Sequence, residues 1–302
     1  MAITAGSDIL ASDFISTSAG AGSSGKVPKL NASGKIDGSF MTDPILRVLT
    51  TSTSYGDYTS SFTITLTGGT TYRYTWNGTG TNPSISLANF PIGSPIAFNS
   101  SNFSAGNNGM FIVTGVGTNY IEVTNASGVA ESNKILGNSN SFAKGAYYNK
   151  PAGLRFIIVE VASGGASGGS TSGSPGIWFT PGGSGGGYSR KIIAASSLPA
   201  SQPYVVGSGG ITFYANGSYF GASGSSSFFG SSLYATGAII NSTGGVGYGG
   251  DFNITGSIGG PQTNAGVGFL GNHGGNGIYG SGYGNVGGPN GLDGKIVITE
   301  FY

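Results

Sequence analysis

From about Asp43 to Lys144, apolar and polar residues alternate with a period of two, which is typical of half-buried β-strands. The clearest pair, Phe62–Leu66 and Tyr72–Trp76, flanks a Gly-Gly step, and strands on either side of a short glycine turn predict a β-hairpin. A second pair, Met110–Val116 and Tyr120–Val123, is separated by only three residues. Closely spaced strands without helical periodicity predict a small antiparallel β-sandwich over residues 42–145.

Two strongly apolar segments enclose the last part of the chain. Leu154–Val161 and the terminal Lys295–Tyr302 are both rich in β-branched and aromatic residues, a composition typical of strands. We expect these two strands to be neighbours in one sheet. The residues between them then form an elaborated insertion within a domain that covers residues 146–302.

This insertion is dominated by glycine and almost free of charge. Forty of the 60 glycines lie between Gly164 and Gly294, and Asp251 is the only formally charged residue from Ile192 to Leu292. Disordered segments combine low hydrophobicity with high net charge, whereas here Tyr, Phe, Ile and Val are interleaved with Gly, Ser and Asn. We therefore expect an ordered domain with an uncharged surface.

Two kinds of structure accommodate so many glycine clusters. Glycine is used where φ is positive or where two backbones approach closely, and elsewhere it costs conformational entropy. The clusters therefore fit either tight loops stacked on one another or left-handed extended helices packed side by side. Glycine does not recur at every third residue, which excludes a collagen helix. Of the two arrangements, we expect irregular stacked loops.

Residues 1–41 form a short separate unit. Ser7 can cap a helical turn that begins at Asp8, and a linker of Thr, Ser, Ala and Gly follows at residues 17–25. Residues 26–41 then place single apolar residues between turn residues, too few to build a core alone. We expect this unit to pack against copies of itself or against another protein. The apolar side of the helical turn consists of Ile9, Leu10, Phe14 and Ile15.

The charge content restricts the partners. Twelve Lys and Arg balance eleven Asp and Glu, for a formal net charge of +1. Nucleic acids and anionic membranes require concentrated positive charge, so we expect neither as a partner. The absence of cysteine excludes disulfides and thiol chemistry. The first eight residues do not resemble an export signal, and no apolar run reaches the roughly 18 residues of a membrane span, so we expect no membrane insertion.

Three segments share their pattern with a known family. Tyr148–Val161 leads straight into two Gly-Gly pairs within residues 164–169, and this resembles the entry strand of glycine-rich domains in bacteriophage tail-fibre and minor tail proteins. Gly291–Tyr302 is similar to their exit strand, and residues 9–40 are similar to the opening of phage tail fibres. The middle of the chain, Asn107–Val123, resembles small β-modules of phage structural proteins.

The resemblance implies an elongated, homotrimeric or otherwise oligomeric virion protein, assembled in the host cytoplasm and acting outside the cell. Its N-terminal segment, residues 1–41, would attach to other tail proteins, and its glycine-rich end would face the host. We therefore expect a mainly β fold with an attachment segment, a small sandwich and a distal glycine-rich domain. The expected function is that of an adhesin without cofactor, which binds a host surface glycan or outer-membrane protein. The attachment residues would be Ile9, Leu10, Phe14 and Ile15.

Aromatic rings are the most credible binding groups, because they stand among Gly, Ser and Asn in the glycine-rich domain. This combination can cover the apolar face of a sugar or grip a protein loop, as antibody paratopes do. Alternatively, the rings fill space that glycine backbone leaves in a core, and we expect this for Phe228 and Phe229. The candidate receptor-binding residues are Trp178, Phe179, Tyr188, Tyr214, Tyr219, Tyr248, Tyr279 and Tyr283.

Enzymatic activity has little support in the sequence. Glycan cleavage typically uses two carboxylates roughly 5 to 10 Å apart. Such a pair would have to be assembled across subunits or by a meeting of Asp251 with Asp293. His273, the only histidine, has no spacing that marks it as a base or metal ligand. We expect no enzyme and no metal, and a glycan depolymerase is the weaker rival. The main alternative is a purely structural virion or filament subunit whose glycine-rich domain makes subunit contacts.

Overall fold

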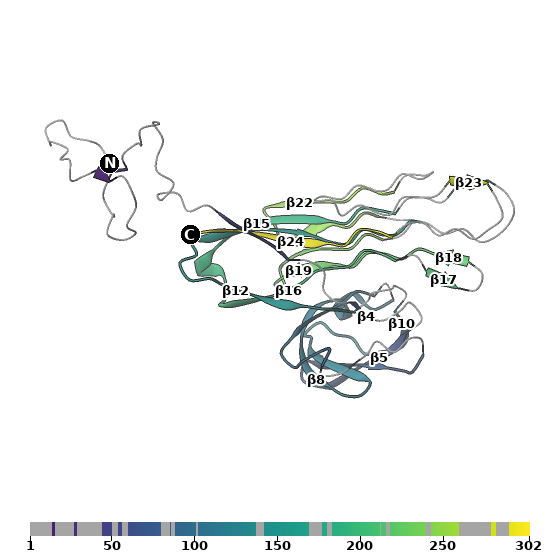
Figure 1. Cartoon of the computed structure of the whole chain (residues 1–302). Coiled ribbons are helices and arrows are strands. Elements are labelled where there is room, and N and C mark those ends of the chain that lie inside the picture. Colours follow the sequence, from purple (N-terminus) through teal and green to yellow (C-terminus); the bar gives the residue numbers. More distant parts are fainter. Residues whose placement is uncertain are drawn as a thin grey trace.

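The computed structural model shows a chain built almost entirely of β-strands and extended segments (Figure 1). It describes residues 44–49, 60–79, 85, 88–100, 102–136, 142–168, 183–211, 221–239, 243–259 and 290–302. For seven short strands it describes the backbone alone. These are β1 (Phe14–Ile15), β2 (Val27–Pro28), β4 (Ser54–Tyr55), β14 (Ile177–Phe179), β17 (Phe213–Ala215), β18 (Ser218–Phe220) and β23 (Tyr279–Ser281).

The fold is mainly β, as the alternation predicted. Within the described residues, helix is confined to two single turns, η4 (Ala105–Asn107) and η5 (Ala195–Ser197). None of the helices in this part of the chain is long and apolar enough to cross a membrane.

The first domain is a β-sandwich-like unit formed by one eight-stranded antiparallel sheet. Besides β4, its strands are β5 (Ser61–Gly68), β6 (Thr71–Trp76), β7 (Pro95–Phe98), β8 (Gly109–Val116), β9 (Tyr120–Thr124), β10 (Glu131–Ile135) and β11 (Phe142–Lys144). Their order is β10-β5-β6-β9-β8-β7-β11-β4, and both predicted hairpins, β5–β6 and β8–β9, are present.

The sheet folds over on itself. Phe62 on β5 and Phe142 on β11 come from strands far apart in the sheet order, yet their ring centroids are 4.7 Å apart. Tyr74 stacks on Phe98 at 4.0 Å, and its buried hydroxyl donates a hydrogen bond to the carbonyl of Asn107. These aromatic contacts fill the centre of the core, which supplies the main hydrophobic stabilisation of this domain.

The second domain begins with two five-stranded antiparallel sheets. One contains β22 (Phe252–Ile254), β15 (Tyr188–Ala194), β13 (Phe156–Ala162), β24 (Lys295–Phe301) and β3 (Ile45–Leu49), in that order. The other contains β12 (Ala146–Asn149), β16 (Ser201–Val205), β19 (Ser227–Phe229), β20 (Leu233–Ala235) and β21 (Gly247–Tyr248). We call them the outer sheet and the inner sheet, because the inner sheet lies next to the sandwich domain (Figure 1).

The predicted pairing of the two terminal strands is confirmed. β13 pairs antiparallel with β24 over its whole length, from Phe156 opposite Phe301 to Ala162 opposite Lys295. Their inward-facing aliphatic residues pack on Phe229 and neighbouring residues of the inner sheet. A single apolar core therefore joins the two sheets of this domain.

One domain boundary differs from the prediction. Residues 45–49 were expected in the sandwich, but as β3 they pair with β24 and complete the outer sheet. Alternation identifies a strand without identifying its sheet, so the sequence could not reveal this partner. Residue 145 lies between β11, in the sheet of the first domain, and β12, in the inner sheet.

Eight strands of the second domain continue into extended segments that we call the glycine bundle. Figure 1 shows these segments running side by side from the two sheets toward β17, β18 and β23. The segments are residues 163–168, 183–187, 206–211, 221–226, 236–239, 243–246, 255–259 and 290–294.

Hydrogen bonds within the bundle repeat every three residues. Successive amides of residues 163–167 donate to three neighbouring segments in turn, and then the cycle starts again. The bonds run from Ser163 to Gly187, Gly164 to Ser225, Gly165 to Leu292, Ala166 to Ser184 and Ser167 to Ala222, at N···O distances of 2.9 to 3.1 Å. A cycle of three residues, in which every hydrogen bond goes to a neighbouring segment, is typical of polyproline II helices packed side by side.

Glycine is needed in this bundle because neighbouring backbones approach closely, and not because φ is positive. None of the glycines described in the bundle has a positive φ. A Cβ added at Gly164 would lie 2.0 Å from the carbonyl oxygen of Ser208, and one at Gly224 would lie 2.2 Å from that of Gly164. The hydrogen bonds and the close backbone approach therefore favour the alternative of extended helices packed side by side over irregular stacked loops. The bundle interior is buried backbone with Ser and Ala side chains.

Little of the N-terminal unit lies within the described residues. Phe14 and Ile15 form strand β1, which pairs in parallel with β2, so the predicted helical turn is wrong at these two positions. A short apolar run cannot be assigned to helix or strand by periodicity alone. Ile9 and Leu10 lie outside the described part of the chain, as do all residues of 1–41 except those of β1 and β2.

Candidate functional site

Two small ribbons carry five of the eight aromatic candidates. β14, with Trp178 and Phe179, pairs with β23 so that Phe179 is opposite Tyr279. β17 pairs with β18 so that Tyr214 is opposite Tyr219. Figure 1 places β17, β18 and β23 at the end of the glycine bundle that is remote from the C-terminus. The fold thus brings residues a hundred positions apart into register at one end of the domain.

Tyr188 does not lie on these two ribbons, and because it is buried, its prediction as a receptor contact was wrong. Tyr188 is 2% exposed, and its hydroxyl donates a 2.5 Å hydrogen bond to the carboxylate of Glu160. Burial raises the pKa of Tyr188, and the Glu160 carboxylate raises it further. The ring fills space against Phe252, whereas Phe228 and Phe229 are buried as expected. Tyr283 lies outside the described residues.

A groove opens where the sandwich domain meets the inner sheet. The two domains touch through a small apolar cluster in which Ala97 and Ala143 contact Val205 and Phe228. Beside this cluster lies a groove of about 880 Å³. Sites for small ligands typically enclose about 300 to 1,000 Å³, so the groove has the size of a binding site.

Three stacked aromatic rings form one wall of this interdomain groove. Phe228, Tyr234 and Tyr248 occupy neighbouring register positions on β19, β20 and β21. The ring centroids are 5.5 Å apart in the first pair and 4.8 Å in the second, with interplanar angles of 21° and 17°. Tyr248 ends the stack and is 42% exposed. Burial raises the pKa of Tyr234, and neighbouring Tyr248 raises it further, so its hydroxyl remains a hydrogen-bond donor at neutral pH.

The opposite wall combines amide side chains with apolar ones from the sandwich domain. The amide nitrogens of Asn108 and Asn125 donate to the carbonyls of Ser100 and Gly106, at 3.0 and 2.8 Å, which fixes both side chains. Met110 lies on the same wall. Among the described lining residues there is no Lys, Arg, Asp, Glu or His. The groove is therefore neutral, with an aromatic side and an amide side.

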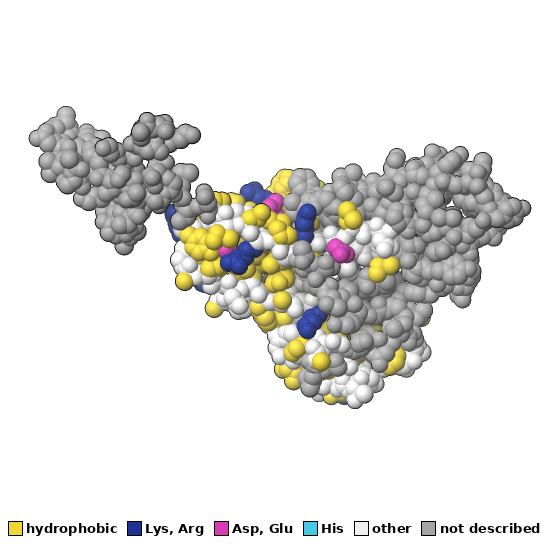
Figure 2. All heavy atoms as spheres, in the orientation of Figure 1, with side chains coloured by type: hydrophobic (Ala, Val, Ile, Leu, Met, Phe, Trp, Pro, Cys, Tyr) yellow, Lys and Arg dark blue, Asp and Glu magenta, His cyan; other side chains and the backbone are white. Residues whose placement is uncertain are grey.

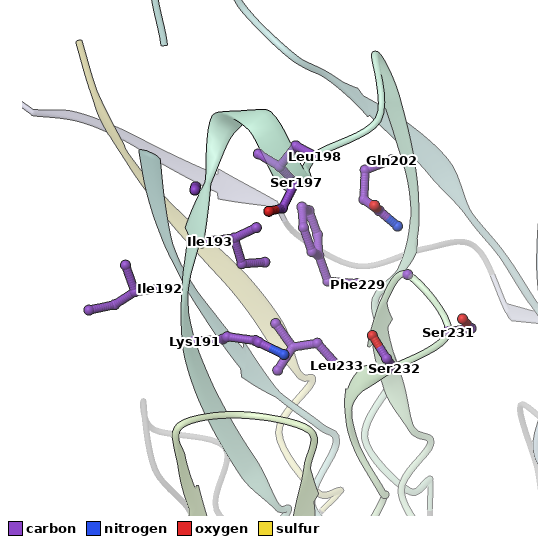
Figure 3. Close-up of a pocket in the computed structure, with 12 residues that line it drawn as sticks. Lys191, Ile192, Ile193, Ser197, Leu198, Gln202, Phe229, Ser231, Ser232 and Leu233 are labelled. Carbon is purple, nitrogen blue, oxygen red and sulfur yellow. The ribbon is translucent and has the colours of Figure 1, made fainter. Parts of the chain in front are cut away.

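A second, smaller pocket of about 430 Å³ lies between β15 and the β19–β20 hairpin (Figure 3). Phe229, Leu233 and Ile193 line it with apolar groups, and Figure 3 shows the side chain of Ile192 directed away from it. Lys191 is the single charged residue described in its lining. General acid–base catalysis commonly uses more than one titratable group, so this pocket offers little to such chemistry.

The described carboxylates that were weighed for catalysis hold backbone in place. Asp251 accepts a 2.9 Å hydrogen bond from the amide of Ile192, and Asp293 accepts one of 2.7 Å from the amide of Gly209. His273 lies outside the described residues, within which no group of three metal-ligating side chains occurs. Asp251 and Asp293 therefore each stabilise a different backbone segment, at Ile192 and at Gly209.

One carboxylate that the sequence analysis missed is fully buried. Glu300 accepts hydrogen bonds from Arg47, Tyr148 and Tyr302 at the base of the second domain. Burial raises the pKa of Glu300, but the hydrogen bonds from these three partners outweigh burial, and the net shift is downward. The cluster links β3 to β24, so it serves the fold rather than a binding surface.

The ring stack was also missed, although a signal for it exists. Phe228 and Tyr234 flank the tight turn at Gly230, which has a φ of +69°, so the two rings are placed opposite each other across a hairpin. Tyr248 joins them from a strand that the sequence analysis did not expect. Comparison with protein-family models and with curated proteins found no match to this chain.

Proposed function

We propose that this protein is a bacteriophage tail-fibre or tail-tip protein that recognises the host cell surface by non-covalent binding. The observation that carries the proposal is the glycine bundle, which runs from the two-sheet base to the ribbons that contain Trp178, Phe179, Tyr214, Tyr219 and Tyr279. A bundle bonded through its backbone is a stiff support, and its remote end is suited to contact with another surface. Asp251 and Asp293, which bond to backbone amides, and the neutral groove favour binding over chemistry.

The low charge of the molecule supports the same proposal. Figure 2 shows few Lys, Arg, Asp and Glu side chains on this face, spread among neutral ones and in places beside a group of opposite charge. Salt screens interactions between exposed charges, and it has little effect on contacts made by aromatic rings and amides. A binding surface of this kind keeps its affinity when the ionic strength of the surroundings changes.

The outer sheet supports a homo-oligomer. Its solvent-facing side carries Leu46, Val48, Ile192 and Phe252, each more than half exposed. Register places Leu46 and Ile192 at opposite ends of one cross-strand row, and Val48 and Phe252 at the ends of the next. Thr299 lies within the first row, and Glu160 and Arg190 lie within the second, so the exposed apolar residues flank a polar centre. Exposed apolar residues gathered on one side of a sheet favour a surface that a partner covers. This observation also favours the second candidate, a purely structural virion subunit.

Imaging of labelled particles separates the two candidates. One tag is inserted between β17 and β18, and a second tag is fused after Tyr302, at the base of the domain. The adhesin proposal predicts that the first label lies on the outside of the tail, farther from the particle than the second. A β17–β18 label that lies between tail subunits, inaccessible to antibody on intact particles, would contradict it and support the structural alternative.

Competition for adsorption tests the function itself. Purified full-length protein should reduce adsorption of the parent phage to its host in a dose-dependent manner. Protein that neither binds host cells nor competes with the phage would refute the proposed function.

A further inference from the structure

We infer that the interdomain groove binds a neutral pyranose oligosaccharide, which stacks on the ring of Tyr248. This inference rests on the proposed function and specifies it, since it names the class of receptor and the residues that hold it. The groove lies at the junction of the two domains, so it is distinct from the ribbons at the end of the glycine bundle.

The ring stack is preorganised to receive a sugar. Tyr248 is held nearly parallel to Tyr234 at 4.8 Å, and Tyr234 is held in turn by the buried Phe228. A ring in a fixed orientation loses little conformational entropy on binding. The apolar face of a pyranose is flat and of similar size to a phenol ring, so it can add one further layer at the exposed end of the stack.

The polar groups of the groove match the hydroxyl groups of a sugar. The hydroxyls of Tyr234 and Tyr248 have no hydrogen-bond partner among the described residues, so both are available to a ligand. Across the groove, hydrogen bonds to backbone through both amide atoms hold Asn108 and Asn125 in place, and each amide oxygen can accept one further hydrogen bond. Fixed amides and hydroxyls beside an aromatic surface are the groups that orient a polar, uncharged ligand.

The absence of charge from the described lining selects among ligands. An acidic polysaccharide would leave its carboxylates or phosphates unpaired in this groove, and unpaired charge is costly to bury. A peptide would bind best along the free edge of a sheet, where backbone hydrogen bonds form. The lining instead offers side chains and the backbone of the bundle segments near Gly224 and Gly237. A neutral glycan therefore fits the groove best.

The test uses the full-length protein and a defined panel of trisaccharides: maltotriose, cellotriose, chitotriose and a galactose-containing trisaccharide, with a sialylated trisaccharide as the anionic member. Binding is measured by calorimetry and by saturation-transfer NMR. At least one neutral member should bind saturably, and Tyr248→Ala should weaken its affinity at least tenfold. Tyr147→Ala is the matched control, because Tyr147 is 39% exposed and lies outside the groove, and it should change affinity less than twofold.

A second pair of variants guards against misfolding of Tyr248→Ala. Ile239 lines the groove and Ile135 does not, and both are 51% exposed. Ile239→Arg should occlude the groove and lower affinity at least tenfold, whereas Ile135→Arg should not.

Three results would overturn the inference. They are failure of all neutral trisaccharides to bind, binding that persists in both groove variants, and binding of the anionic member or of a host outer-membrane protein alone. Host-cell binding distinguishes this failure from failure of the proposed function. If the wild type and the groove variants bind host cells equally, the groove is not the site, but the protein remains an adhesin.

Discussion

Substitution of Gly164 by alanine tests the physical basis of the glycine bundle. The new Cβ would lie 2.0 Å from the carbonyl oxygen of Ser208, 2.6 Å from its carbonyl carbon and 3.0 Å from the amide of Gly209. All three atoms are backbone, so no side chain can rotate away. The segment at residues 206–211 would have to move by roughly 1 Å or more to restore a normal contact.

The magnitude follows from what this movement disrupts. Ser208 accepts a 2.8 Å hydrogen bond from the amide of Ser225, and the amide of Gly209 donates a 2.7 Å bond to Asp293. Overpacking of an interior typically costs about 1 to 3 kcal/mol, and each buried polar group left unpaired costs about 1 to 3 kcal/mol more. If both groups lose their partners, these costs sum to at least about 3 kcal/mol, so we expect Gly164→Ala to lower the free energy of unfolding of the second domain by about 3 kcal/mol or more.

Urea unfolding measures this loss. With a slope of about 1 to 3 kcal/mol per molar urea, the midpoint for the second domain should fall by at least about 1 M. Gly68→Ala is the control, because a Cβ at Gly68 meets no atom within 4 Å, and its midpoint should be unchanged or slightly raised. If Gly164→Ala unfolds at the wild-type urea concentration, the close backbone packing described for the bundle is incorrect.

Three further predictions follow from other parts of the structure. The pKa of Glu300 is lowered in the fold, so its stabilisation is present above the ordinary carboxyl pKa of about 4.3 and is lost as pH falls through the lower folded value. Urea midpoints should drop below about pH 4, and Glu300→Gln should flatten this dependence while Asp251→Asn should not; equal slopes in both variants would argue against it. Ser163→Ala removes a buried hydroxyl that bonds Gly187 and Thr236, whereas Ser184→Ala removes the one buried hydroxyl without a partner among the described residues. The first should destabilise the protein by about 1 to 3 kcal/mol in urea unfolding and the second by much less, and the reverse order would refute the bonding scheme. Adsorption to host cells should change less than about threefold between 50 and 500 mM NaCl, and a steep decline would show that charges dominate binding.

The elements of the fold were predictable wherever neighbouring residues determine them. Alternation around Phe62–Leu66 and Tyr72–Trp76 predicted a hairpin, and this hairpin is present. The pairing of β13 with β24 was also predictable, because both strands are so apolar that they need a shared core. β3 was assigned to the wrong sheet, since its partner β24 lies some 250 residues away and leaves no local trace.

The glycine bundle was harder to predict, because glycine clusters suit loops and packed extended helices equally well. What distinguishes the two is the three-residue cycle of bonds from residues 163–167 to segments far along the chain, and no local spacing encodes it. The candidate aromatics divided for a similar reason. Tyr188 and Tyr248 have similar neighbours in the sequence, but only Tyr188 is buried and bonded to the carboxylate of Glu160. The position of Tyr234 depends on two rings from neighbouring strands that stack on either side of it.

Amide hydrogen exchange on the full-length protein tests the central claim most directly. Residues 163–168, 206–211 and 221–226 lie outside the strands adjoining them, yet their amides are buried, and many bond to neighbouring segments. Buried, bonded amides exchange only when the structure opens. We predict that these segments exchange as slowly as strands β13 and β24. Exchange of these segments at the rate of an unstructured chain, with β13 and β24 still protected, would contradict the account.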